Sequence, residues 1–63
     1  MFTEIIGTGS IVNVAEGTKN YYGWSIAAGD WEVISVGPNG LATIRSPRSG
    51  AREDIMVSEL RAI

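Results

Sequence analysis

Apolar and polar residues alternate along most of the chain in short runs separated by glycine, a pattern that predicts strands rather than helices. Residues 10–15 form a β-branched run, where we predict the first secure strand. Residues 31–36, 41–46 and 51–57 form three more runs, which we expect to pair as an antiparallel meander. The chain is therefore predicted to be all-β.

The connections between these runs carry different signals. The stretch 37–40 has the sequence Gly-Pro-Asn-Gly, in which Pro38 presets φ and the Asn or the last Gly can supply the positive φ of a hairpin turn. A second turn is predicted at 47–50. Residues 17–30 hold three glycines and three aromatic residues without a sustained period. We expect a long, partly ordered loop there, and loops of this length in small domains are often functional.

The two ends of the chain are less regular. Residues 58–61 predict a single helical turn with Ser58 at its start, and residues 62–63 can add a last short strand. Leu60 is expected to close one end of the core. Residues 1–9 are predicted to be flexible or to include an edge strand, and a turn of helix over 2–6 remains an alternative.

This order of elements resembles the SH3-like small barrel. The likeness rests on residues 29–34 (Gly-Asp-Trp-Glu-Val-Ile), similar to the diverging turn and second strand of that family, and on residues 57–63, similar to its closing turn and last strand. It covers residues 10–63. The resemblance implies one domain over 1–63, a five-stranded barrel with a one-turn 3-10 helix before the last strand. Many unrelated functions share this fold.

The sequence departs from two functional classes of that family. Proline-recognising members carry an Ala-Leu-Tyr-Asp-Tyr-type segment and a Trp-Trp pair, whereas residues 11–15 and 41–44 here have the sequences Ile-Val-Asn-Val-Ala and Leu-Ala-Thr-Ile. A polyproline groove is therefore not expected. Chromatin-type members use an aromatic cage for methylated lysine. Such a cage could be imitated here by Tyr21, Tyr22, Trp24 and Trp31, but the sequence does not fix the geometry of these rings.

Composition narrows the chemistry further. The 63 residues include no Cys and no His, which excludes disulfides, zinc fingers, Cys or His nucleophiles and His-based metal sites. We expect no metal and no cofactor. Five Lys and Arg face seven Asp and Glu, so the net charge of −2 has the wrong sign for binding mainly to phosphate backbones. Nucleic acid is therefore the less favoured partner.

Targeting signals are weak. No apolar run approaches the roughly 20 residues needed to cross a bilayer, and the first six residues contain an acid where a secretion signal would carry Lys or Arg. We expect a complete small gene product in the cytoplasm, with no membrane association.

Two groups of side chains are candidates for partner binding. Adjacent aromatic residues supply large contact area, so the aromatic loop is a candidate recognition surface, although single rings could instead cap the core. For Trp31, core packing is preferred over an interface. Arginines of the second hairpin could grip a carboxylate or phosphate, or could form a solvated surface whose charge Glu53 and Asp54 cancel. The candidates are Tyr21, Tyr22, Trp24, Trp31, Arg45, Arg48 and Arg52.

No pair of carboxylates is placed for acid–base work, since Asp30 fits a turn and Glu53 and Asp54 face opposite ways on a strand. The sequence therefore predicts a non-enzymatic module that binds a protein partner or a second copy of itself. Small acidic barrels of this kind resemble accessory proteins of phages and mobile elements, which redirect a host factor. The alternatives are a nucleic-acid-associated module using the loop aromatics and hairpin arginines, and an oligomeric small-ligand binder.

Overall fold

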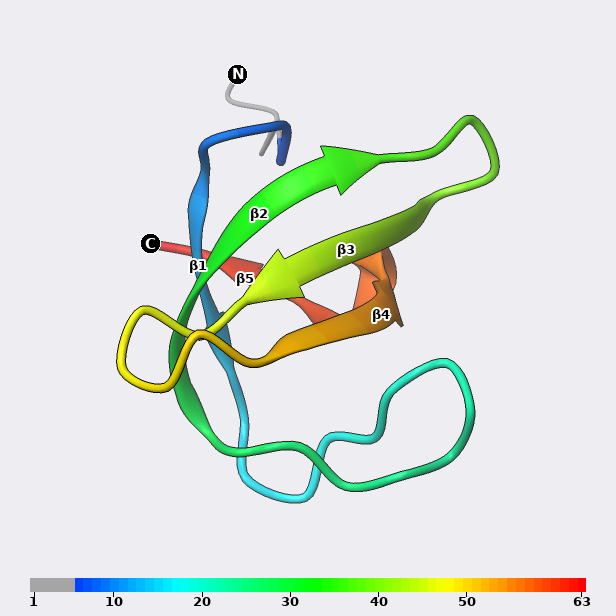
Figure 1. Cartoon of the computed structure of the whole chain (residues 1–63). Helices are drawn as coiled ribbons and strands as arrows, with labels where there is room; N and C mark the ends of the chain where they lie inside the picture. Colours follow the sequence, from blue (N-terminus) through cyan, green and yellow to red (C-terminus); the bar gives the residue numbers. More distant parts are fainter. Residues whose placement is uncertain (1–5) are drawn as a thin grey trace.

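Five antiparallel strands form one sheet in the computed structural model, which describes residues 6–63 (Figure 1). A single 3-10 turn precedes the last strand, so the predicted all-β class and the presence of a 3-10 turn before that strand are confirmed. The elements in chain order are β1 (Ile11–Val14), β2 (Gly29–Val36), β3 (Leu41–Arg45), β4 (Arg52–Met56), the 3-10 turn η1 (Val57–Glu59) and β5 (Arg61–Ala62).

The hydrogen-bonded order of the strands is β4-β3-β2-β1-β5. The sheet of the described residues is not closed, because β4 and β5 stand at its two ends. Figure 1 shows β1 and β5 crossing behind β2 and β3, so the sheet curls around its own inner face. The register of β2 against β3 shifts between Val33 and Ser35, and such a bulge bends a strand and increases its twist. The curl lets one small sheet enclose a core.

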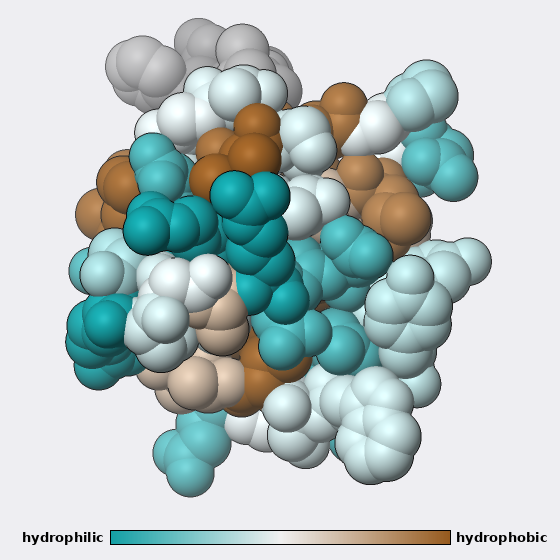
Figure 2. Space-filling view, viewed as in Figure 1, coloured by the Kyte–Doolittle hydropathy of each residue, from teal (hydrophilic) through white to brown (hydrophobic). Residues whose placement is uncertain are grey.

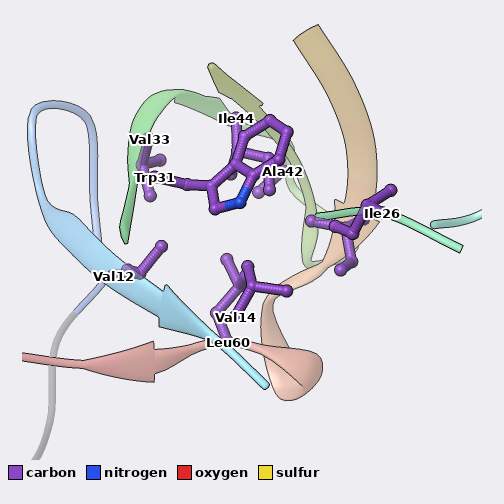
Figure 3. Packing of buried hydrophobic residues seen from close by; sticks show 9 residues of the cluster. Val12, Val14, Ile26, Trp31, Val33, Ala42, Ile44 and Leu60 are labelled. Carbon is purple, nitrogen blue, oxygen red and sulfur yellow. The ribbon is translucent and has the colours of Figure 1, made fainter. Parts of the chain in front are cut away.

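The core lies on the inner face of this curled sheet, and Figure 3 shows its side chains converging around Trp31. Burial alternates along β1 and β3, as expected for strands with one face packed and one face in solvent. The side chain of Leu60, just after η1, is also buried. The buried apolar residues are Val12, Val14, Ile26, Trp31, Val33, Ala42, Ile44, Ile55 and Leu60.

Two details of the predicted elements were wrong. The 3-10 turn starts at Val57 rather than at Ser58, and the residue before it, Met56, makes no capping hydrogen bond through its side chain. The turn is instead closed by the backbone, where the Leu60 N–H donates to the Val57 carbonyl over 2.9 Å. The last strand is Arg61–Ala62 rather than 62–63.

The prediction for residues 1–9 falls largely on residues 1–5, which lie outside the described residues. Residues 7–10 form a hydrogen-bonded turn, in which the Gly7 N–H donates to Ser10 Oγ and the Ser10 N–H donates to the Gly7 carbonyl. This turn is bound to β2, since Gly9 N–H donates to the Val33 carbonyl and Val33 N–H donates to the Ser10 carbonyl, each over 2.8 Å. The expected flexible stretch is therefore held against the sheet by its backbone.

Candidate functional site

The long loop between β1 and β2 is folded into a small hairpin of its own. Lys19 and Ser25 form an isolated antiparallel bridge, and the Asn20 N–H donates to the Trp24 carbonyl over 2.7 Å. The tip is a three-residue turn in which the Gly23 N–H donates to the Asn20 carbonyl and Gly23 has a φ of +88°. Such loops require a residue at positive φ, which glycine adopts without strain. We call residues 19–25 the aromatic hairpin.

The side chain of Asn20 fastens this hairpin. Its Oδ1 accepts hydrogen bonds from the backbone N–H groups of Tyr22 (3.0 Å) and Trp24 (2.9 Å). Its Nδ2 donates to Glu53 Oε1 of β4 over 2.9 Å. One amide therefore closes the turn from within and attaches it to the sheet. Sequence reasoning missed this residue, although Asn three positions before Gly is a common start of a tight turn.

Asp54 of β4 provides the second attachment. Its backbone carbonyl accepts from the Tyr21 N–H over 2.8 Å, and its Oδ2 accepts from the Tyr22 hydroxyl over 3.3 Å. The other carboxylate oxygen accepts from Thr43 Oγ1 over 2.9 Å, which orients the carboxylate from the β3 side. Main chain and side chain of one strand residue thus position both tyrosines.

The three aromatic rings of the hairpin lie on the surface. The exposed fractions are 59% for Tyr21, 66% for Tyr22 and 72% for Trp24, so none of them caps the core. The two tyrosine rings meet edge to face, with centroids 5.4 Å apart and planes at 88°. This arrangement is favourable for aromatic pairs. The hairpin therefore presents all three rings to solvent.

A shallow hollow of about 270 Å³ lies between the aromatic hairpin and η1. On one side it is bounded by the base and first ring of the hairpin, and on the other by the end of β4 and the 3-10 turn. It places polar and charged groups next to the rings. The residues that line it are Lys19, Asn20, Tyr21, Met56, Ser58 and Glu59.

Trp31 does not belong to this surface. Its ring is only 3% exposed and packs in the core (Figure 3), and its indole Nε1 donates to the Ala27 carbonyl over 2.9 Å. A four-ring cage that includes Trp31 is therefore not formed, because the side chain is on the inner face of β2. The loop also supplies a core residue that the sequence did not reveal. Ile26, directly after the hairpin, is buried and belongs to the same core cluster as Trp31.

The three candidate arginines occupy two different places. Arg45 and Arg52 face each other across β3 and β4 in the sheet register, and Arg45 Nη1 lies 3.9 Å from Glu32 Oε1. Arg48 lies in the β3–β4 turn, where its Nη2 donates to the Ala28 carbonyl over 3.3 Å. It borders a separate hollow of about 370 Å³, lined by Gly29, Asp30, Pro47 and Arg48.

Glu53 and Asp54, the acids expected to offset the arginine charges, make their side-chain hydrogen bonds with neutral groups. Both carboxylates are occupied elsewhere, Glu53 by Asn20 and Asp54 by Thr43 and Tyr22. Within residues 6–63 the single ion pair within 4 Å is the one between Arg45 and Glu32. The acid that meets an arginine therefore comes from β2, the strand that precedes β3 in the chain, because the register places Glu32 opposite Arg45.

Two further observations bear on the class of the protein. In the described part of the chain, no three Asp or Glu side chains lie close enough together to hold a metal ion. Among the same residues, no helix is long and apolar enough to span a bilayer.

In comparisons with known proteins, no family model, curated protein or solved structure matches the chain.

Proposed function

We propose that the chain is a non-enzymatic binding module that contacts a protein partner through the aromatic hairpin and the hollow beside it. The observation that carries this proposal is the exposure of three neighbouring rings on a hydrogen-bonded support. Exposed aromatic residues are enriched at the energetic centres of protein interfaces. Rings that serve only the core would have been drawn inward, as Trp31 is.

The attachment of the hairpin supports recognition in a second way. The hydrogen bonds that Asn20 makes and those that Asp54 accepts fix the turn before any partner arrives. Binding therefore avoids most of the cost of ordering a loop, which is about 0.5–1.5 kcal/mol for each immobilised side chain. A rigid turn carrying Tyr and Trp is suited to selecting one partner surface.

The small area of the three rings limits the binding free energy that they can supply alone. Covering three rings that are about two-thirds exposed removes on the order of 400 Å² from water, or about 10 kcal/mol before costs. Association itself costs about 4–15 kcal/mol. The rings therefore supply weak to moderate affinity, and neighbouring polar groups must add to it.

The strand order supports a finer assignment of the fold. We propose an SH3-like barrel, because β5 pairs with β1 and a single 3-10 turn connects β4 to β5. The small size and the net charge of −2 fit an accessory protein of a phage or mobile element, acting in the cytoplasm on a host factor.

The test compares capture of partners by the immobilised wild type with capture by a Tyr22→Ala/Trp24→Ala variant. We expect the variant to lose partners that the wild type retains. The control is Ile63→Ala, since Ile63 is 77% exposed but lies outside the hairpin. Light scattering of each protein gives its mass in solution and shows whether the partner is a second copy of the chain. Retention of every wild-type partner by the double variant would contradict the proposal.

A further inference from the structure

A charged row crosses the outer face of three strands. Glu32 of β2 is opposite Arg45 of β3, and Arg45 is opposite Arg52 of β4. These side chains face away from the core, because their strand neighbours Ile44 and Val33 are buried on the inner face. In Figure 2 hydrophilic residues gather across the middle of the visible face, over β2 and β3.

The two arginines of this row occupy directly opposite positions on β3 and β4. The Ser46 N–H donates to the Ala51 carbonyl over 2.8 Å, which makes that pair the hydrogen-bonded one. The next pair along the ladder, Arg45 and Arg52, is therefore a non-hydrogen-bonded pair, in which side chains lie closest. Like charges directly opposite each other destabilise a sheet.

Among residues 6–63, no ion pair within 4 Å reaches both arginines. Glu32 reaches Arg45 at 3.9 Å, and both side chains remain about 40% exposed (42% and 40%). Arg52 has no acidic partner within 4 Å among residues 6–63. The nearest acid on its own strand face, Asp54, is bound by Thr43 and Tyr22. The row thus has two guanidinium groups for one carboxylate.

We infer that Arg45 and Arg52 form a subsite for the carboxylate of one acidic side chain of the protein partner. This inference rests on the proposed function and specifies the chemistry of its partner. A carboxylate placed between the two guanidinium groups would accept hydrogen bonds from both and remove their repulsion. Because the chain has a net charge of −2, a single carboxylate suits this local positive site better than an extended polyanion does.

The subsite is continuous with the aromatic hairpin. Asp54 lies two residues after Arg52 on the same strand face, and its carboxylate holds the hydroxyl of Tyr22. One extended partner segment can therefore place an acidic side chain on the arginines and an apolar side chain on the rings. This arrangement supplies the polar contribution that the rings alone lack.

The binding test uses a short capped peptide of glutamate and glycine as the probe, titrated by calorimetry at low salt. Arg52→Glu is expected to raise the Kd for this peptide about tenfold or more, since it replaces a charge-assisted contact with repulsion. The matched control is Arg61→Glu, an equal charge change on exposed β5 at the other end of the strand order, which should raise the Kd less than about threefold. Equal Kd values for the wild type and Arg52→Glu would overturn the inference.

A stability measurement tests the geometry independently. Arg52→Glu converts a repulsive cross-strand pair into an attractive one, so we expect its midpoint of thermal unfolding to rise by about 2–6 °C. Arg61→Glu should give no such rise. A lower midpoint for Arg52→Glu would show that the pair of arginines is not repulsive, and would also overturn the inference.

Two further titrations separate the inference from its rivals. A single-stranded oligonucleotide that binds with an equal dependence on Arg52 would identify phosphate rather than a protein carboxylate as the ligand, and would refute the inference. Trp24→Ala should bind the glutamate peptide as the wild type does, because this probe has no apolar side chain. The two proposals are therefore tested separately. Partner capture by the aromatic variant tests the proposed function, and peptide binding by Arg52→Glu tests the carboxylate subsite.

Discussion

Replacing Asn20 with alanine tests whether one side chain holds the aromatic hairpin. The substitution removes two hydrogen bonds to backbone N–H groups and one to the Glu53 carboxylate. A neutral hydrogen bond contributes about 0.5–1.5 kcal/mol, and one to a charged group contributes more. Because the turn is exposed, water replaces part of this loss, and we expect the free energy of unfolding to fall by about 1–2 kcal/mol. For a chain of this size the unfolding midpoint should fall by about 4–16 °C.

Two assays report on this change at different levels. Thermal unfolding followed by tryptophan fluorescence gives the global effect, and amide hydrogen exchange gives the local one. The N–H groups of Tyr22 and Trp24 should exchange much faster in Asn20→Ala, since their acceptor is gone. Amides of the central strands β2 and β3 should change only as far as global stability changes.

A charge rearrangement provides the matched control. Asn20→Asp keeps an acceptor for the two N–H groups but places a carboxylate next to Glu53, so it should destabilise the hairpin. Adding Glu53→Gln supplies an amide donor in place of the carboxylate, and the double variant should recover about 1 kcal/mol relative to the sum of the single changes. The reasoning is refuted if Asn20→Ala unfolds within about 0.3 kcal/mol of the wild type with unchanged exchange at both amides.

Three other substitutions test how the loop joins the core. Ile26→Ala should lower the free energy of unfolding by about 2–3 kcal/mol in chemical denaturation, because the side chain is buried although it follows a surface hairpin; a loss below about 0.5 kcal/mol would place it outside the core. Trp31→Phe should cost about 1–3 kcal/mol by the same measurement, since it removes volume and the hydrogen bond to the Ala27 carbonyl. Gly29→Ala should cost about 1–2 kcal/mol, because Gly29 has a φ of +121° and a Cβ there would lie 2.6 Å from Arg48 Nη2. Adding Arg48→Ala should relieve the contact but not the strain of the backbone, so full recovery in that double variant would contradict this explanation.

The sequence predicted the strands well because their signal is local. Burial alternates along β1 and β3, with apolar residues at every buried position, and the turn at 37–40 forms where its Gly-Pro-Asn-Gly sequence predicts. The 3-10 turn was located to within one residue. Its start was misplaced because the backbone, rather than the Ser58 side chain, closes it.

The site was less predictable because its geometry depends on contacts that are distant in sequence. The aromatic residues were recognised from composition, but the position of their hairpin depends on two contacts with β4. Asn20 bonds to Glu53, 33 residues away, and Tyr22 bonds to Asp54, 32 residues away. Glu32 and Arg45 are likewise brought together only by strand pairing. The burial of Ile26 within a loop has no periodic signal, since a single apolar residue cannot establish a period.

The backbone hydrogen bond from Tyr21 to Asp54 has a consequence for solubility. β4 is a terminal strand of the sheet, and exposed edges of this kind can pair with the edges of other molecules and begin aggregation. The Tyr21 N–H occupies a carbonyl that such an intruding strand would need. The hairpin therefore covers part of the β4 edge in addition to exposing its rings. Variants in which the hairpin detaches from β4 should aggregate more readily when concentrated.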